Sequence, residues 1–158
     1  MENNDKYNRI SVVTVTLNSA NTLNRCIQSV IINGKYIRQH IIVDGGSCDN
    51  TLEIVNNYQK EQSSIEDGIE VVVLHQEGKG IYNAMNLGVT HCDTSSYVGI
   101  LNSDDEYVTS SLMCVSQYFH EGFELIHGIC EIIYESGDVE HHGLHHSLLP
   151  YKSIYHPT

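Results

Sequence analysis

The sequence has few basic residues. Its 158 residues include only 8 Lys and Arg against 20 Asp and Glu, which gives a formal net charge of −12. Nucleic-acid binding depends on clustered positive charge, so this balance argues against a DNA or RNA partner. It equally disfavours the anionic surface of a membrane. No apolar run approaches the roughly 20 residues that a membrane span requires, so no transmembrane segment is expected.

Signals for secretion and for disulfide bonds are also missing. Residues 1–9 do not show the basic and then apolar segments of a signal peptide. The five cysteines are an odd number and form no closely spaced pairs. Reduced thiols in a cytoplasmic protein are therefore the simplest interpretation. A chain of this length is expected to fold as one domain, residues 1–158, and to bury a core.

The chain does contain a regular alternation of apolar strands and amphipathic helices. Short runs rich in β-branched residues predict four strands, at residues 10–17, 40–43, 70–74 and 98–101. Apolar residues at helical spacing predict four helices, at residues 23–31, 51–60, 81–89 and from about 109 onward. This alternation predicts an α/β fold, an open and mostly parallel sheet with helices on both faces, as in Rossmann-like nucleotide-binding proteins.

Local patterns refine these helices. Asn18 and Ser19 are predicted to cap the first helix, and Asn50 with Glu53 the second. Core-facing stripes are predicted on the last two helices, at Ile81, Ala84, Met85, Gly88 and Val89 and at Leu112, Val115 and Phe119. A further strand is expected from Leu125 to Tyr134, followed by a turn at Gly137.

Polar groups follow each of the four strands. Asn18 follows the first strand, Asp44 the second, residues 76–80 the third, and Asp104 with Asp105 the fourth. Ligands of open α/β sheets bind beyond the carboxyl ends of the strands, so these groups are expected to line one cleft. Taken alone, the Asp104–Asp105 pair is more simply a turn that caps the next helix.

The chemistry of these groups suits a nucleotide diphosphate. The Asp44 carboxylate can accept hydrogen bonds from a nucleobase or a ribose hydroxyl, and Ser47 adds a small donor. Asp104 and Asp105 can hold Mg²⁺ or Mn²⁺, with water and phosphate oxygens completing the shell. Neither GxGxxG after the first strand nor GxxxxGK[ST] anywhere is present, so dinucleotide and P-loop interpretations fail.

Four segments in this order, ISVVTVTLN, IIVDGGSCDNT, GKGIYNAMNLGV and YVGILNSDDEY, resemble family 2 glycosyltransferases of the glycosyltransferase A fold. The similarity covers about residues 10–158 and is strongest to the bacterial branch that builds surface polysaccharides. It implies inverting sugar transfer from a nucleotide-diphosphate sugar to a saccharide or lipid-linked acceptor, which could bring the protein to a membrane. It implies a Mg²⁺ or Mn²⁺ ion on Asp105 and Asp104, and donor contacts from Leu17, Asn18, Asp44, Ser47, Lys79, Gly80 and Asp104.

The chain departs from the family pattern at three points. Relatives usually carry Asp where Gly78 and Asn83 stand, although the neighbouring Glu77 can substitute. Relatives also continue for roughly another hundred residues, about the core of a small domain, which hold the acceptor site. The catalytic base is therefore expected beyond Thr158 and no residue of this chain is assigned to it. A missing acceptor half would leave apolar surface near the fourth strand, so self-association is expected.

Two other functions remain open. One is an inactive nucleotide-sugar binding module, or a decayed remnant that lacks the base. The other, a nucleotidyltransferase, is disfavoured because residues 16–21 after the first strand carry no Gly-rich, basic loop.

The tail, about residues 138–158, is rich in histidine. Its pairs His141/His145 and His142/His146 have the spacing of a zinc site on a helix, but Gly143 weakens a helix there. A solvated loop is expected instead. Cys48, beside the Asp44 loop, is interpreted as a tolerated small residue and not as a nucleophile.

Overall fold

The computed structural model describes residues 10–78, 80–119, 121, 123–126, 128, 130–134 and 136–142. The chain groups into two compact units, residues 1–116 and 117–158, and each is described here by itself. The single domain over residues 1–158 stays a prediction.

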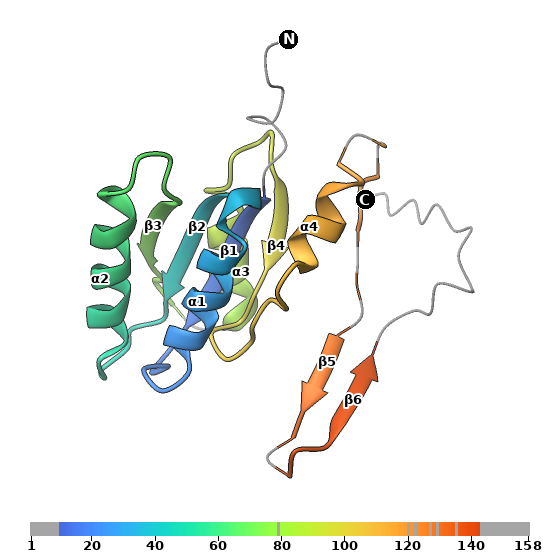
Figure 1. Ribbon diagram of the computed structural model, residues 1–158. Helices are drawn as coiled ribbons and strands as arrows, with labels where there is room; N and C mark the ends of the chain where they lie inside the picture. Colours follow the sequence, from blue (N-terminus) through green and yellow to red (C-terminus); the bar gives the residue numbers. More distant parts are fainter. Residues whose placement is uncertain are drawn as a thin grey trace. The chain divides into compact units, whose positions relative to one another are not determined.

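The first unit is built on a parallel sheet of four strands in the order β3-β2-β1-β4 (Figure 1). The strands are β1 (Ile10–Thr16), β2 (Ile37–Asp44), β3 (Glu70–His75) and β4 (Tyr97–Ile100). All four lie within a few residues of their predicted positions. Every residue of β1 is buried, as expected for an apolar strand with neighbours on both edges. The strand order reverses between β1 and β4, which is where open sheets bind ligands.

Helices cover both faces of this sheet (Figure 1). The unit contains α1 (Leu23–Ile32), the short 3₁₀ helix η2 (Gly34–Tyr36), α2 (Thr51–Ser63), α3 (Ile81–Val89) and α4 (Ser111–Ser116). Thr14 faces α1, with its hydroxyl 4.0 Å from the Cys26 sulfur. Its neighbour Val13 points to the opposite face, where α3 packs. The prediction of an open parallel sheet with helices on both faces is confirmed.

Helix α3 packs so closely on β1 that one of its positions, residue 88, has to be glycine. A Cβ on Gly88 would lie 2.3 Å from Val13 Cγ1, so no side chain fits between α3 and β1. Ala84 is buried in the same cluster, with Met85 packed against it. The predicted stripe is wrong at its two ends, because Ile81 and Val89 are 50% and 40% exposed. The cluster is centred on β1 and β2, which leaves the ends of a nine-residue helix partly beyond it.

The predicted caps and the fourth helix also need correction. Helix α1 begins after Thr22, and no side chain caps it. Asn50 stands at the start of α2 but makes no side-chain cap either, so the predicted capping box is not formed. Helix α4 has six residues and ends at Ser116, so it does not extend to Phe119.

A buried polar network joins the sheet to α2. The ring of His40 on β2 is fully buried, with Nε2 2.9 Å from the Thr14 hydroxyl and Nδ1 3.2 Å from the Tyr58 hydroxyl. Burial lowers the pKa of His40 to about 3, so the ring is neutral and bonds through one N–H and one lone pair.

The second unit contains an antiparallel hairpin of β5 (Cys130–Ile133) and β6 (Val139–His142). Gly137 forms the predicted turn with φ 87°, and its N–H donates to the Tyr134 carbonyl. The strand predicted from Leu125 to Tyr134 is too long: among the residues described there, those that form a strand are Cys130–Ile133, which make β5. His141 and His142 lie in β6, so the solvated loop expected for the tail is wrong at these two residues, which are not on a helix either. His145 and His146 lie outside the described residues.

Two observations concern the chain as a whole. All five cysteines are free. Within the described ranges, no helix combines the length and the hydrophobicity that a bilayer span requires.

Candidate functional site

The segments after β1 and β2 are tied together at the carboxyl edge of the sheet. Asn18 adopts a left-handed conformation with φ 52°, which turns the chain sharply at the end of β1. Its N–H donates to Ser47 Oγ at 2.9 Å, and its side-chain oxygen accepts from the Cys48 N–H at 2.8 Å. The Asn18 side chain therefore bridges two loops, and this is why it does not cap α1. Leu17, beside it, is 58% exposed at the same edge.

Asp44 is held by its own loop. Its side chain is 1% exposed. Oδ2 accepts from the N–H groups of Gly46 at 2.9 Å and Ser47 at 3.0 Å, and Oδ1 accepts from the Ser47 hydroxyl at 2.5 Å. His75 Nδ1 lies 3.8 Å from Oδ2. These donors occupy most of the lone pairs of the carboxylate, so it stabilises the turn after β2 in this structure.

A second carboxylate, Asp49, joins the same two loops and was not identified from the sequence. It accepts from the N–H of Ala20 and from both the N–H and the hydroxyl of Thr51. The Thr51 hydroxyl, then the backbone donors, hold the pKa of Asp49 below its usual value. Thr51 Oγ1 in turn accepts from the Ser19 N–H at 2.8 Å. The Ser19–Thr51 and Ala20–Asp49 pairs join residues about 30 positions apart in sequence, so no local sequence pattern predicts these bonds.

The acidic loop, residues 102–107, follows β4 at the point where the strand order reverses. Ser103 Oγ lies 2.8 Å from Ser19 Oγ, which joins this loop to the end of β1. Asp104, Asp105 and Glu106 are exposed. The Asp105 N–H donates to the Asn102 carbonyl at 3.1 Å, so the pair does form a turn, yet its carboxylates face solvent.

The segment after β3 completes the edge. The Gln76 N–H donates to the Asp44 carbonyl, and the Gln76 side chain donates to the Gly80 carbonyl at 3.0 Å. Gly78 and Gly80 both have φ 108°, a conformation that glycine adopts readily. Lys79 lies outside the described residues. Every other predicted contact residue is at the carboxyl edge of the sheet, on segments linked through hydrogen bonds.

The oxygen atoms of the acidic loop that could coordinate a metal suit a divalent ion that binds together with a ligand. They suit a permanently bound ion less well. Among the described residues, no three His, Cys, Asp or Glu side chains gather closely enough to hold a metal. The Asp104 and Asp105 carboxylates are exposed and can act as metal ligands. Asn102 Oδ1 is buried and accepts no hydrogen bond from the described part of the chain. Mg²⁺ typically uses one or two carboxylates together with water and substrate phosphates, which matches this arrangement.

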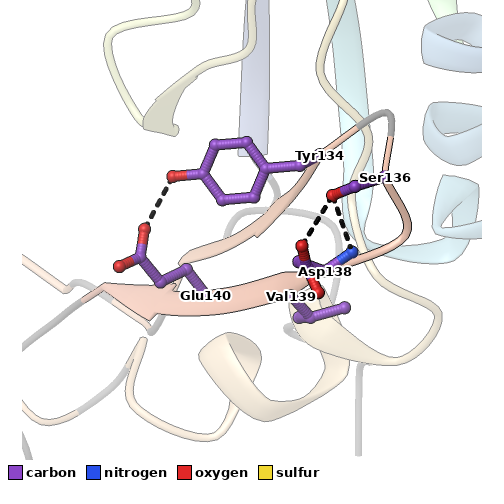
Figure 2. Close-up of a pocket in the computed structure, with 5 residues that line it drawn as sticks. All are labelled: Tyr134, Ser136, Asp138, Val139 and Glu140. Carbon is purple, nitrogen blue, oxygen red and sulfur yellow. Dashed lines mark hydrogen bonds between the residues drawn. The ribbon is translucent and has the colours of Figure 1, made fainter.

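Surface hollows lie at other places. One is formed in the second unit by residues of the hairpin, where Figure 2 shows the Tyr134 hydroxyl bonded to Glu140 and the Ser136 hydroxyl bonded to Asp138. The Glu140 partner raises the pKa of Tyr134. Another hollow lies between α2 and β3. Neither of these two hollows is lined by a predicted site residue.

Comparison with known proteins identifies the family. The model of the family described as Glycosyl transferase family 2 matches residues 11–157, nearly the whole chain. The chain belongs to glycosyltransferase family 2. A PGL/p-HBAD biosynthesis glycosyltransferase of Mycobacterium tuberculosis is 31% identical over 122 residues, which are 75% of this chain and 45% of that relative. The chain thus spans about half the length of the curated relatives of this group.

Solved structures share the fold. A mannosyltransferase from Pyrobaculum calidifontis, in complex with GDP-Man and Mn²⁺, has a TM-score of 0.60 at 19% identity, over 73% of this chain and 33% of that one. S. aureus TarS 1-349 in complex with UDP has a TM-score of 0.59 at 21% identity, over 72% and 32%. At these identities the likeness concerns the fold, and it agrees with the glycosyltransferase A fold expected for the family.

Proposed function

We propose that this chain binds the nucleoside diphosphate of a nucleotide-sugar donor at the carboxyl edge of its sheet. It then serves the inverting transfer of the sugar to a saccharide or lipid-linked acceptor in polysaccharide biosynthesis, in the cytoplasm. The observation that carries the proposal is the Ser19–Ser103 contact of 2.8 Å. It places the exposed carboxylates of the acidic loop beside the end of β1, where the strand order reverses. The GDP-Man and UDP complexes of the two structural neighbours support the same class of ligand.

Asp104 and Asp105 are proposed to hold a Mg²⁺ or Mn²⁺ ion together with the diphosphate. A divalent ion supplies neutralisation of the charge that develops on the departing nucleoside diphosphate. With 20 acidic residues against 8 basic ones, the chain would otherwise repel a diphosphate, and Lys79 is the basic residue proposed to meet it.

The nucleoside is proposed to lie over the segments after β1 and β2. Leu17 offers an exposed apolar surface to the base, and Asn18 and Ser47 are polar groups of the same edge. Asp44 can accept from the base only if the Ser47 hydroxyl turns away, because that hydroxyl now occupies Oδ1. Its proposed contact with the base is therefore coupled to a local change in the loop.

Binding without transfer is the alternative. By the family resemblance, carboxylates are expected where Gly78 and Asn83 stand, and their absence supports this alternative. A radiolabelled UDP-sugar or GDP-sugar assay over candidate acceptors separates the two functions. It should be run on this chain and on one extended by any natural continuation. Transfer by this chain alone would place the base within residues 1–158, with Glu106 and Glu131 as the first residues to substitute.

Metal-dependent binding is the decisive test. UDP and GDP are titrated calorimetrically into the chain with and without Mn²⁺, for the wild type, for Asp105→Asn and for the matched control Glu66→Gln, an exposed residue between α2 and β3. We expect Mn²⁺ to raise wild-type and control affinity. Asp105→Asn should lose about tenfold to a hundredfold of that gain, the scale of one charge-assisted contact, while its Tm is unchanged. Equal affinity with and without metal in the wild type would refute the metal assignment.

A further inference from the structure

The acidic loop is anchored at both ends, and its middle is exposed to solvent. At its start, Ser103 is 8% exposed and its hydroxyl meets that of Ser19. At its end, the Tyr107 N–H donates to Ser29 Oγ at 3.0 Å. Asp104 and Asp105, between these anchors, are exposed. Groups outside the loop thus hold its two ends, while inside it the Asn102 side-chain amide donates to Asp105 Oδ2 at 3.3 Å.

Helix α1 supplies the anchors of the backbone. Ser29 is buried, and its hydroxyl donates to the Cys26 carbonyl at 2.7 Å while accepting from Tyr107. One turn earlier, the Cys26 thiol donates to the Asn102 carbonyl at 3.5 Å. Burial raises the pKa of Cys26 to about 12, so the sulfur keeps its proton and acts as a donor. One face of α1 therefore forms hydrogen bonds with the first and last residues of the loop, Asn102 and Tyr107.

These hydrogen bonds counteract the electrostatic repulsion between the carboxylates of the loop. Three consecutive carboxylates, Asp104, Asp105 and Glu106, lie on a chain with a net charge of −12. Arg25 lies beside them, with its Nε 3.5 Å from Glu106 Oε1 and both side chains about half exposed. A pair so open to solvent contributes little. Besides the bond from Asn102 Nδ2 to Asp105 Oδ2, neutral hydrogen bonds from Ser19, Cys26 and Ser29 are therefore the main restraints on the loop that carries the carboxylates.

We propose that Ser29 and Ser19, with Cys26, are positioning residues that hold the acidic loop ready for metal-dependent donor binding. This inference rests on the proposed function. None of the three supplies a ligand, because the Ser29 and Cys26 groups bond to loop backbone and Ser19 bonds to Ser103. They act by preorganisation. When the loop is already in its bound geometry, binding does not have to include the free-energy cost of ordering carboxylates that repel one another.

The experiment compares two buried serines of equal chemistry. Ser29→Ala removes the acceptor of the Tyr107 N–H. Ser11→Ala removes a hydroxyl that is 0% exposed and bonds to Gln39, near the amino end of β1 and away from the acidic loop. For each variant, UDP affinity is measured by calorimetry with and without Mn²⁺, and Tm is measured alongside.

Both variants should lower Tm, but only Ser29→Ala should reduce the Mn²⁺-dependent gain in UDP affinity. We expect a reduction of about fivefold, the factor that one neutral hydrogen bond is worth, with metal-free affinity unchanged. Ser19→Ala should do the same and is the second variant if Ser29→Ala does not fold. Cys26→Ala should reduce the gain, and Cys26→Ser, which keeps a donor, should restore it.

Each remaining outcome overturns a stated idea. A wild-type gain that Ser29→Ala and Ser19→Ala both leave intact would refute the positioning role and leave the proposed function standing. An equal loss in Ser11→Ala would mean that general destabilisation, and not the hydrogen bonds to the loop, sets the affinity. No metal-dependent gain in the wild type would refute the proposed function and this inference together.

Discussion

Acidification should destabilise this protein through His40 before most of its carboxylates are protonated. The ring is fully buried between Thr14 and Tyr58, and the other titratable groups of this network, the Tyr58 hydroxyl and the Cys26 thiol, both stay protonated because burial raises their pKa values. Burial without a carboxylate partner lowers the pKa of His40 from 6.5 to about 3. The unfolded chain therefore takes up a proton at a pH where the folded chain does not.

The size of the effect follows from this pKa difference. Because the folded pKa is the lower one, the stability contribution is complete above pH 6.5 and is lost as pH falls toward 3. One pKa unit corresponds to about 1.4 kcal/mol. The free energy of unfolding should therefore fall by about 2 kcal/mol between pH 7 and pH 5 from His40 alone, a large part of the stability of a small domain.

Urea unfolding followed by circular dichroism at pH 8, 6 and 5 measures this loss. His40→Gln is expected to be less stable at pH 8 but to lose about 2 kcal/mol less than the wild type on acidification. His91→Gln, on an exposed side chain, is the control and should keep the wild-type dependence. A His40→Gln variant with the same pH dependence as the wild type would show that the buried ring is not what titrates.

Two further predictions concern the edge of the sheet. Asp44→Ala should weaken calorimetric binding of UDP and of a UDP-sugar equally, by about 1–3 kcal/mol, because the contact proposed for Asp44 is remote from the sugar; an unchanged Kd would leave Asp44 only its role in the turn. Val98 and Ile100 on β4 are 43% and 44% exposed, so we expect self-association in sedimentation velocity that Val98→Thr with Ile100→Thr reduces. A wild-type chain that sediments as a monomer at all concentrations would contradict this expectation.

The strands and helices of the first unit could be predicted because their signals are local. Runs such as Ile10–Thr16 are apolar on both faces, and the carboxyl ends of such strands meet at one edge whatever the loops contain. The exposed carboxylates of Asp104 and Asp105 were therefore placed correctly at that edge.

The contacts that shape the site could not be predicted, because they join distant segments. Asn18 and Ser19 look like capping residues by position, but their side chains bond to Cys48 and Ser103, 30 and 84 residues away. The local hydrogen bonds of Asp44 depend on Gly46 adopting φ 95°, which brings two N–H groups and a hydroxyl to one carboxylate. Such preferences are weak in isolation and are decided by packing.

The position of β4 in the sheet has a consequence for how the chain assembles. Residue 10 pairs with residue 37 on β2 but with residue 97 on β4, so β4 closes a loop about three times longer. The extra entropy of closure is about 1 kcal/mol. β4 has only four residues and one paired edge with which to offset it. The carboxylates thus follow the strand that is expected to open most easily from the sheet. A ligand that contacts both β1 and β4 would therefore slow amide hydrogen exchange in β4 more than in any other strand of the sheet.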